Sequence, residues 1–576
     1  MTATPAPTSV PPNEAGACLR ALYECEWAWR REQFAGFDDE DGEGAPADHL
    51  PRVDAASQLQ REHYWRDVLA QLDAIALDQL DERDATDFAV YRAQIETLLA
   101  QQRFRCWEMP FNSDSAFWTD LGFTARRARH DADDYERYLG QLHDIPRYFD
   151  EHIANMRAGL ARGFSVPRVT LTGREQSIAQ VLEAACIEDN PFYTPFRAMP
   201  ANIPADTQAH LRERAAAAIR TTVLPAHAKL LDFIRDEYLP QARATLSAEA
   251  MPDGAAFYRA QIRRFTTLDM TPEAIHSLGL QEVARLREEM LATITRTGFN
   301  GSFESFLHYL RTDPQFYPQT GEQLLRQAAW IASRVDGCIE RYIGRLPRRR
   351  FAIEPVPAEL APFYTSGRGG PGMYLLNTHD LPSRPLYALT ALTLHEASPG
   401  HALQMPLAAE LDGLPDFRRL THISAYIEGW ALYSEKLGVE MGLYETPFDH
   451  FGYLAYQAWR ACRLVVDTGL HHLGWSRPQA CTYLREHTAL SEHEIRTEVD
   501  RYIAWPGQAL SYYLGEMCIV QARAKAEQAL GPRFDLRAFH DAVLATGSVP
   551  LTVLEQYIDR FIARGGRSPW TDAASH

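Results

Sequence analysis

Hydrophobic residues in the most regular parts of the chain recur every three or four positions, which is the spacing of an amphipathic α-helix. One such stretch opens with Thr271, Pro272 and Glu273, typical of a helix N-cap, first-turn proline and first-turn acid, and Gly298 is a suitable stop. Its apolar positions are Val283, Leu286, Met290, Leu291 and Ile294. Similar patterns occupy 55–101, 131–160 and 324–342. The chain is therefore predicted to be mostly α-helical.

Strand patterns are few and short. The two candidates are residues 350–356 and 373–377, and a glycine-rich run at 367–372 precedes the second. We expect them to form a small β-sheet. The predicted organisation is a disordered N-terminal tail over 1–15, a helical N-terminal lobe over 16–250 and a helical catalytic lobe over 251–576, with the boundary near 248–254.

The composition is that of a soluble globular protein. Lys and Arg number 58 against 76 Asp and Glu, a formal net charge of −18, which disfavours nucleic acid and anionic membranes because both reward a positive surface. The eight cysteines are scattered without a CxxC pair, which indicates reduced thiols, and residues 1–13 lack the basic start and apolar stretch of a signal peptide. No uninterrupted apolar run approaches the roughly 18 residues of a membrane span. We expect a cytoplasmic protein, monomeric or homodimeric, with neither nucleic acid nor a membrane as its partner.

The run LHEASPGH contains two imidazoles and a carboxylate directly after the first of them. These are the components of a zinc-binding helix, but the histidines of an HExxH motif are four residues apart. His395 and His401 are six apart, about 240° around a regular helix, so that their side chains would diverge. Pro399 cannot donate to the helical ladder, Gly400 tolerates unusual backbone angles, and Ser398 is a suitable cap for a restarted turn. If both histidines bind one metal ion, the helix must break at these three residues.

A third ligand is available farther along the chain. The helix-compatible segment YIEGWALYSE contains Glu428, 27 residues after His401. Two neutral imidazoles and one carboxylate leave a coordination position open, which is typical of catalytic zinc. A second His-Glu pair, His493-Glu494, has no histidine four or six positions later. The prediction is one Zn²⁺ per chain, bound by His395, His401 and Glu428.

HEASPGH followed by EGWALYSE resembles the signature of a bacterial family known as domain of unknown function eight-eight-five, whose members resemble gluzincin zinc metallopeptidases. Blocks similar to the family also lie at 163–168, 463–471 and 501–512, so that the resemblance covers most of the chain. The EGWALY stretch is similar to the NEGFA helix of gluzincin aminopeptidases, whose glutamate is the third zinc ligand, and this favours Glu428 over Glu435. The resemblance implies a mostly α, two-lobed helical zincin-like fold with a small β-sheet beside the metal helix.

Three residues are candidates for catalysis. Glu396 is expected to act as the general base that takes a proton from a zinc-activated water as the water attacks a carbonyl. The oxyanion that forms needs a hydrogen-bonding partner besides zinc, typically Tyr, His or Arg. In the family pattern the positions of His471 and Tyr512 are the characteristic ones, and we prefer them, although each is equally compatible with a core position.

Other residues are candidates for binding the substrate or orienting the metal ligands. Arg460, Arg463 and Arg501 offer bidentate partners for a substrate carboxylate, although a helix arginine is more often in an ion pair. The segment 367–377 offers a strand edge for an extended peptide, and its candidate contacts are Gly370, Tyr374 and Asn377. A metal-bound imidazole usually donates its free N–H to a carboxylate or carbonyl, and Asp467 and Glu435 both remain candidates for that acceptor.

These features predict a zinc-dependent metallopeptidase that hydrolyses amide bonds of short peptides, as an oligopeptidase or a carboxypeptidase. A zinc amidase or esterase acting on a non-peptide metabolite would need the same zinc, base and oxyanion partner. A third interpretation is a non-catalytic helical binding protein with a vestigial site. The presence of both histidines and both glutamates speaks against the third, and only a survey of substrates separates the first two.

Overall fold

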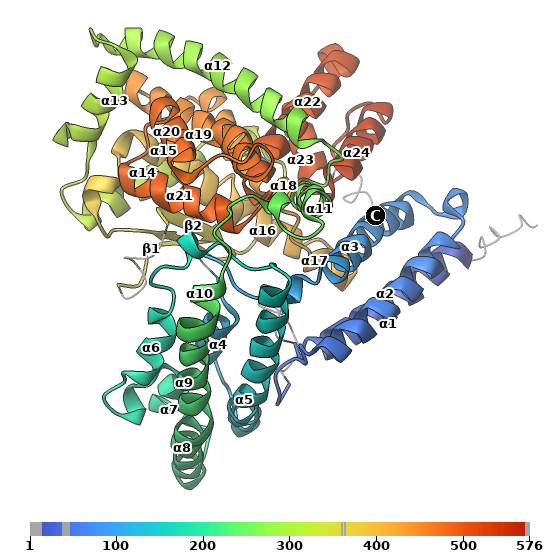
Figure 1. Ribbon diagram of the computed structural model, residues 1–576. Coiled ribbons are helices and arrows are strands. Elements are labelled where there is room, and N and C mark those ends of the chain that lie inside the picture. Colours follow the sequence, from blue (N-terminus) through green and yellow to red (C-terminus); the bar gives the residue numbers. More distant parts are fainter. Residues whose placement is uncertain (1–13, 37–46, 114, 359–360, 362–364, 571–576) are drawn as a thin grey trace, which may run out of the picture.

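The protein is described here from a computed structural model that covers residues 14–36, 47–113, 115–358, 361 and 365–570. Helices account for 70% and strands for 3% of it, which confirms a mostly helical chain with a small sheet (Figure 1). Of the predicted tail, residues 1–13 lie outside the described residues, and Glu14 and Ala15 already belong to the first helix. None of the described helices combines the length and apolar character that crossing a bilayer requires.

The first three helices pack against the C-terminal part of the chain. They are α1 (Glu14–Gln33), α2 (Ala55–Asp73) and α3 (Glu82–Phe104). Trp65 and Tyr91 from these helices share one buried hydrophobic cluster with Trp430 and Phe539. The predicted boundary near 248–254 does not separate that cluster, because it contains residues from both sides. The division into two lobes stays a prediction.

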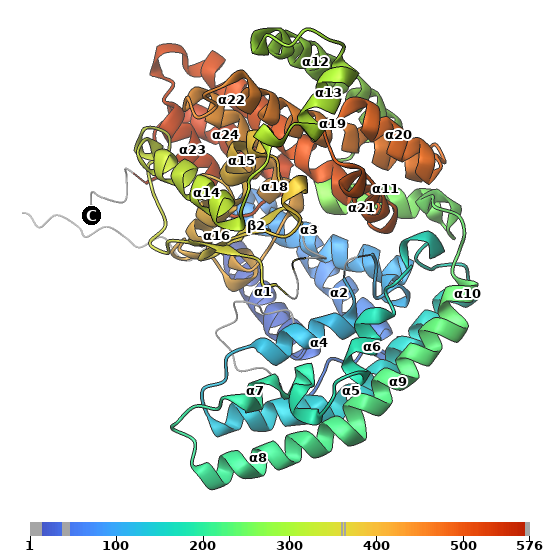
Figure 2. The same ribbon diagram turned by 90° about the vertical axis from the view of Figure 1, so that its left-hand side faces the viewer.

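The next group of helices projects away from the rest of the molecule (Figures 1 and 2). Its members are α4 (Phe117–Arg126), α5 (Ala132–Ala161), α6 (Gln176–Leu182), α7 (Thr194–Arg197), α8 (Ala205–Ala218), α9 (Leu224–Asp232) and α10 (Leu239–Gln241). The last three form one rod, joined by π-helical turns at Ile219–Val223 and Phe233–Tyr238. Pro225 and Pro240 follow these turns. Proline has no N–H to donate to the backbone hydrogen bonds of a helix, and the wider π-helical turns accommodate this loss. This group has its own buried cluster.

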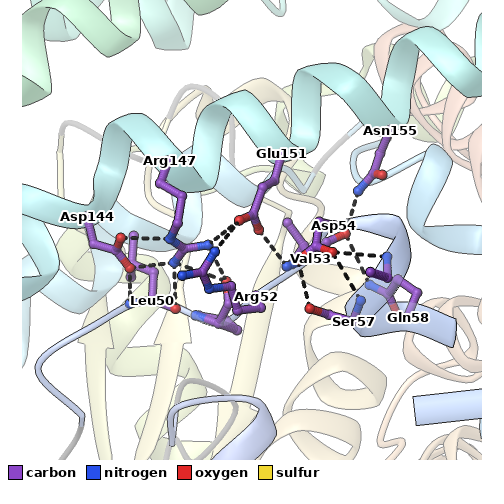
Figure 3. A network of polar contacts seen from close by, with 12 residues as sticks. Leu50, Arg52, Val53, Asp54, Ser57, Gln58, Asp144, Arg147, Glu151 and Asn155 are labelled. Carbon is purple, nitrogen blue, oxygen red and sulfur yellow. Dashed lines mark hydrogen bonds and ion pairs between the residues drawn. The ribbon is translucent and has the colours of Figure 1, made fainter. Parts of the chain in front are cut away.

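Helix α5 holds the segment that leads into α2 through a network of polar contacts (Figure 3). The Arg147 guanidinium donates to the carbonyl of Leu50 at 2.8 Å and to Asp144 Oδ1 at 2.8 Å. Glu151 accepts from the backbone N–H of Val53 at 2.8 Å and also pairs with Arg147. The backbone of an irregular segment is thereby satisfied by side chains of one helix, as buried polar groups require.

The C-terminal part of the chain contains the largest core and the candidate site. Its helices are α11 (Gly254–Thr266), α12 (Pro272–Thr297), α13 (Phe303–Thr312), α14 (Gly321–Asp336), α15 (Leu386–Glu396), α16 (His401–Ala409), α17 (Asp416–Arg419), α18 (Ser424–Glu440), α19 (Pro447–His471), α20 (Arg477–His487), α21 (Glu492–Ala504), α22 (Ser511–Leu530), α23 (Leu536–Leu544) and α24 (Leu551–Ala563). Helix α19 is apolar along most of its length and packs against α12 and α15.

The helix predicted between Thr271 and Gly298 is confirmed as α12, with Thr271 accepting from the N–H of Ala274 and Gly298 in the left-handed region. Leu291 is 44% exposed, so it is not one of the core positions of this helix. The helix predicted over 324–342 is shorter than expected, because α14 ends at Asp336 and only a 3-10 turn follows at Ile339–Arg341.

Three strands form the small sheet in the order β1-β3-β2. They are β1 (Ala352–Pro355), β2 (Gly367–Gly370) and β3 (Met373–Leu376). Strand β3 pairs parallel with β1 and antiparallel with β2. Both predicted strands are confirmed, and the glycine-rich run also contributes a strand, which lies at an edge of the sheet. Helices α15 and α16 contact that edge strand.

Candidate metal centre

The helix that carries the first histidine stops one residue after it, and a new helix starts at the second histidine. Helix α15 ends at Glu396, Ala397 and Gly400 leave the helical conformation, and α16 begins at His401. A Cβ on Gly400 would lie 1.9 Å from the carbonyl oxygen of His395, so this position accepts only glycine. The interruption at residues 398–400 is therefore confirmed, and it turns both imidazoles toward one point.

Three donor atoms converge at that point. Nε2 of His395 lies 3.4 Å and Nε2 of His401 lies 3.5 Å from Oε2 of Glu428. The two imidazole rings are nearly perpendicular, at 87°, with centroids 4.9 Å apart. His395 and His401 are buried, at 3% and 7% exposure, while the Glu428 side chain keeps 20%. The predicted metal ligands are thus brought together, with one ligand atom from each within 4.8 Å of the others.

Glu428 reaches this position because two helices cross at glycines. It lies on α18, directly before Gly429, whose added Cβ would meet the backbone of Gly515 on α22 at 2.4 Å. In return, a Cβ on Gly515 would lie 2.0 Å from the carbonyl oxygen of Ala425. The close crossing brings α22, which also carries Tyr512, against the helix of the third ligand. Sequence reasoning did not identify the role of either glycine. The available signal was Gly429, which directly follows Glu428 in the EGWALY segment.

Glu435 orients the first ligand. Its Oε1 accepts a hydrogen bond from Nδ1 of His395 at 2.8 Å, and its side chain is fully buried. Nη2 of Arg460 lies 3.7 Å from the same oxygen. Asp467 is occupied elsewhere, since it accepts from the hydroxyl of Tyr258 at 2.6 Å and from the backbone N–H of Gly507. Of the two candidates for the acceptor of a ligand histidine, Glu435 fills that place and Asp467 does not.

The cluster stabilises a positive charge on His395 and a negative charge on Glu428. Burial by itself lowers the pKa of His395, but the Glu428 and Glu435 carboxylates outweigh it and raise the pKa to about 10. Burial alone raises the pKa of Glu428, yet the two imidazoles hold it well below its ordinary value. Oε2 of Glu428 is also buried without a hydrogen-bond partner. Two imidazole nitrogens and one carboxylate are a ligand set suited to Zn²⁺, and the hydrogen bond from His395 to Glu435 is typical of a zinc-binding histidine.

Glu396 is held by the edge strand of the sheet. Its Oε2 accepts a hydrogen bond from the backbone N–H of Gly369 at 2.6 Å. A Cβ on Gly369 would lie 1.8 Å from the carbonyl oxygen of Glu396, so only glycine permits this approach of β2 to the end of α15. Sequence reasoning placed the strand edge in this region but did not single out Gly369.

Tyr512 lies beside the first ligand. Its ring is roughly parallel to that of His395, at 16°, with centroids 6.4 Å apart, and its hydroxyl accepts a hydrogen bond from Nη2 of Arg501 at 3.3 Å. Arg463 places its guanidinium 4.3 Å from the Tyr512 ring. It is buried and engaged by the Tyr502 hydroxyl and by the Glu498 carboxylate. Tyr512 therefore borders the cluster of His395, His401 and Glu428, and Arg501 bonds to its hydroxyl. Arg463 is buried behind the Tyr512 ring, where its partners already engage it.

The structure corrects the prediction that His471 binds the oxyanion. Both ring nitrogens of His471 bond to backbone groups, with Nε2 donating to the carbonyl of Tyr502 at 2.8 Å and Nδ1 accepting from the N–H of Ala248 at 3.1 Å. Burial lowers the pKa of His471 to about 3, as expected for a neutral core histidine. It has no proton donor to spare for an oxyanion.

The predicted substrate contacts in the sheet are also structural. Tyr374 is fully buried in the cluster under the sheet, and Asn377 is fully buried with its amide donating to the carbonyls of Ala361 and Thr365. Gly370 is buried in the hairpin and meets nothing closer than 3.8 Å at an added Cβ. The backbones of Gly367 and Gly369 instead face away from β3, because alternate residues of an antiparallel strand do so, and the N–H of Gly369 already donates to Glu396.

The fold and the site together define a class of protein. It is a mostly helical protein in which two histidines and a glutamate converge beside the edge strand of a small sheet. The chain belongs to the family described as "Bacterial protein of unknown function (DUF885)", whose profile matches residues 32–558. No curated protein matches the chain.

Two solved structures are similar to the chain. One is described as a putative lipoprotein from Colwellia psychrerythraea, with a TM-score of 0.87 and 26% identity, covering 96% of this chain and 99% of that one. The other is described as a putative lipoprotein of unknown function from Shewanella oneidensis, with a TM-score of 0.67 and 16% identity, covering 94% and 99%. The second shows the fold alone.

Proposed function

We propose that this protein is a zinc-dependent metallopeptidase that hydrolyses amide bonds of short peptides. One observation carries the proposal: donor atoms of His395, His401 and Glu428 lie within 4.8 Å of one another at a helix break that the sequence builds with a proline and a glycine. The resemblance of both motifs to those of gluzincin peptidases supports a two-lobed zincin-like arrangement around this centre.

The residues of the chain would divide the reaction between them. His395, His401 and Glu428 would hold a zinc ion, which would supply the Lewis acidity for activating a water and polarising a carbonyl. Glu396 accepts the proton of the attacking water and passes it to the leaving amine. The hydroxyl of Tyr512, oriented by Arg501, donates to the oxyanion that forms on the carbonyl. Glu435 fixes the tautomer and the direction of His395.

The substrate backbone would pair with the outer edge of β2 at Gly367, since edge strands commonly bind extended peptides by adding a strand. The next outward-facing N–H, that of Gly369, donates to Glu396, so this edge leads to the candidate base. The partner is thus a small peptide or peptide-like molecule. A cytoplasmic location stays a prediction, and the 26% identical structure described as a putative lipoprotein favours testing the cell envelope as well.

Elemental analysis of purified protein and digestion of a peptide library test this proposal together. We expect one zinc per chain, loss of zinc in His401→Ala and no change in His493→Ala, whose histidine is exposed on α21. Glu396→Gln should retain zinc and lose cleavage. Protein that stays free of zinc after metal-replete purification would refute the metal site. Cleavage of esters or non-peptide amides in place of peptides would reassign the substrate, and no Glu396-dependent hydrolysis of any kind would refute catalysis.

A further inference from the structure

A mostly apolar pocket lies beside α15, between α19, the loop before α21 and the start of β2. The space that the centre of a water-sized sphere can occupy inside it is about 50 Å³. The lining residues used below are Ser366, Leu389, Leu392, Tyr456, Trp459 and Ala489. Its two charged residues already have partners, since Arg384 donates to the Ser366 hydroxyl and Glu494 accepts from the N–H of Ser491. Most of the remaining lining is apolar.

The pocket lies on the same face of α15 as the candidate base. Leu392 and Leu389 precede Glu396 by four and seven residues, so that all three side chains point to one side of the helix. An added Cβ on Gly367, the first residue of β2, would lie 3.6 Å from Leu392. The pocket and the start of β2 are therefore neighbours, and Leu392 between them lies about one helical turn before Glu396.

A second set of contacts joins the pocket to the metal ligands. The guanidinium of Arg463 lies 4.4 Å from the ring of Trp459, which lines the pocket, and 4.3 Å from the ring of Tyr512. Tyr512 in turn lies beside His395. Arg460 stacks on two of the three aromatic residues of the pocket, at 4.5 Å from Tyr456 and 4.1 Å from Trp459. The aromatic wall is thus fixed by two buried arginines.

We propose that this pocket is a specificity site that receives a branched aliphatic side chain, of the leucine class, from the peptide residue next to the cleaved bond. This inference rests on the proposed peptidase function. A peptide paired with the edge at Gly367 would direct every second side chain to one side of the strand, and Ser366 of the pocket directly precedes that edge. One water needs about 10–15 Å³, so the volume holds roughly three to five water-sized groups, which fits leucine and excludes tryptophan.

Peptide affinity in a Glu396→Gln background tests the pocket without turnover. Isothermal titration with Ala-Leu-Ala, Ala-Gly-Ala and Ala-Trp-Ala should show the leucine peptide binding at least tenfold more tightly than the other two. Ala489→Leu, on a partly exposed loop position, should fill the pocket and reduce the preference for leucine over glycine below twofold. Ala489→Val is the milder variant if the leucine variant fails to fold. Leu280→Trp, at a 45% exposed position of α12, is the matched control and should preserve the preference.

The outcomes separate the two proposals. The expected ranking of affinities in a protein that cleaves no peptide would support the pocket and contradict the peptidase. Peptide cleavage by the wild type with the same side-chain preference in Ala489→Leu and Ala489→Val would overturn the pocket alone. Absence of any preference among the three tripeptides in the Glu396→Gln protein would also overturn it.

Discussion

Oε1 of Glu435 accepts a hydrogen bond from Nδ1 of His395 at 2.8 Å, on the side of the ring opposite to the nitrogen that faces Glu428. A carboxylate in this place directs the lone pair of Nε2 toward the metal and increases its basicity. Glu435→Gln should therefore weaken zinc binding about 10–100-fold. Competition with a chromophoric chelator measures this change.

Asp467→Asn is the informative comparison for that experiment, because Asp467 was the competing candidate. Its carboxylate bonds to Tyr258 and Gly507 instead of a ligand histidine. Zinc affinity should stay within about twofold of wild type, while thermal stability falls as a buried hydrogen-bonded group is altered. Equal losses of zinc affinity in the two variants would contradict the assignment of Glu435.

The two candidate histidine ligands were accessible to sequence reasoning because their chemistry is local, whereas Glu428 was preferred to Glu435 through the resemblance to gluzincin aminopeptidases. The spacing of His395 and His401 requires a break, and the residues between them are those that produce one. The choice between Glu435 and Asp467 was not accessible, because it depends on which helix faces Nδ1 of His395, a tertiary relation between distant segments. His471 was predicted wrongly for the same reason, since its ring nitrogens bond to backbone groups 31 and 223 residues away.

The sheet gives a similar lesson. The glycine-rich run was recognised as a backbone approach, but the sequence could not tell which glycine touches the site. Gly369 bonds to Glu396, whereas Tyr374 and Asn377 point into the core. The side chains of β3 alternate between the two faces of the sheet. Which of them are buried can be told only once the face that packs against α15 is known.

Gly369→Ala should reduce catalysis while leaving the metal in place. Its Cβ would lie 1.8 Å from the backbone oxygen of Glu396, so β2 must move and release the carboxylate. A displacement of about 1 Å at a catalytic group can cost about 100-fold, and we expect a loss of this order in kcat/KM. Steady-state kinetics and zinc content measured on one sample check both parts.

Gly370→Ala is the matched control for that substitution, since nothing lies closer than 3.8 Å to its added Cβ. It should leave kcat/KM within about threefold of wild type. A comparable loss in both variants would show that the hairpin as a whole, and not the contact of Gly369 with Glu396, determines activity.

Arg147→Met should destabilise the protein by about 1–2 kcal/mol. The substitution keeps the aliphatic stem but removes the donor that serves the carbonyl of Leu50 and two carboxylates of α5. Arg157→Met on the same helix is the control, because its pair with Glu237 is about half exposed and screened by solvent, so that its loss should change the stability little. Urea unfolding of both variants measures the difference, and equal effects would contradict the role of the network.

His152→Leu should make the protein less sensitive to acid. Both ring nitrogens of His152 are buried without a hydrogen-bond partner, and the ring stacks on Phe117 with centroids 3.9 Å apart. Burial, with a smaller contribution from Arg147, lowers the pKa of His152 from 6.5 to about 3.

The direction of the pH effect follows from that shift. The unfolded chain binds a proton at His152 near pH 6.5 and the folded chain does not, so the stability is present above that pH and is lost as the pH falls toward 3. Between pH 7.5 and pH 5 the wild type should lose about 2 kcal/mol of unfolding free energy through this residue, and His152→Leu should not. His143→Leu, an exposed histidine of the same helix, is the control and should keep the wild-type slope. Urea unfolding at the two pH values decides the matter, because an unchanged slope in His152→Leu would mean that the folded protein can protonate His152.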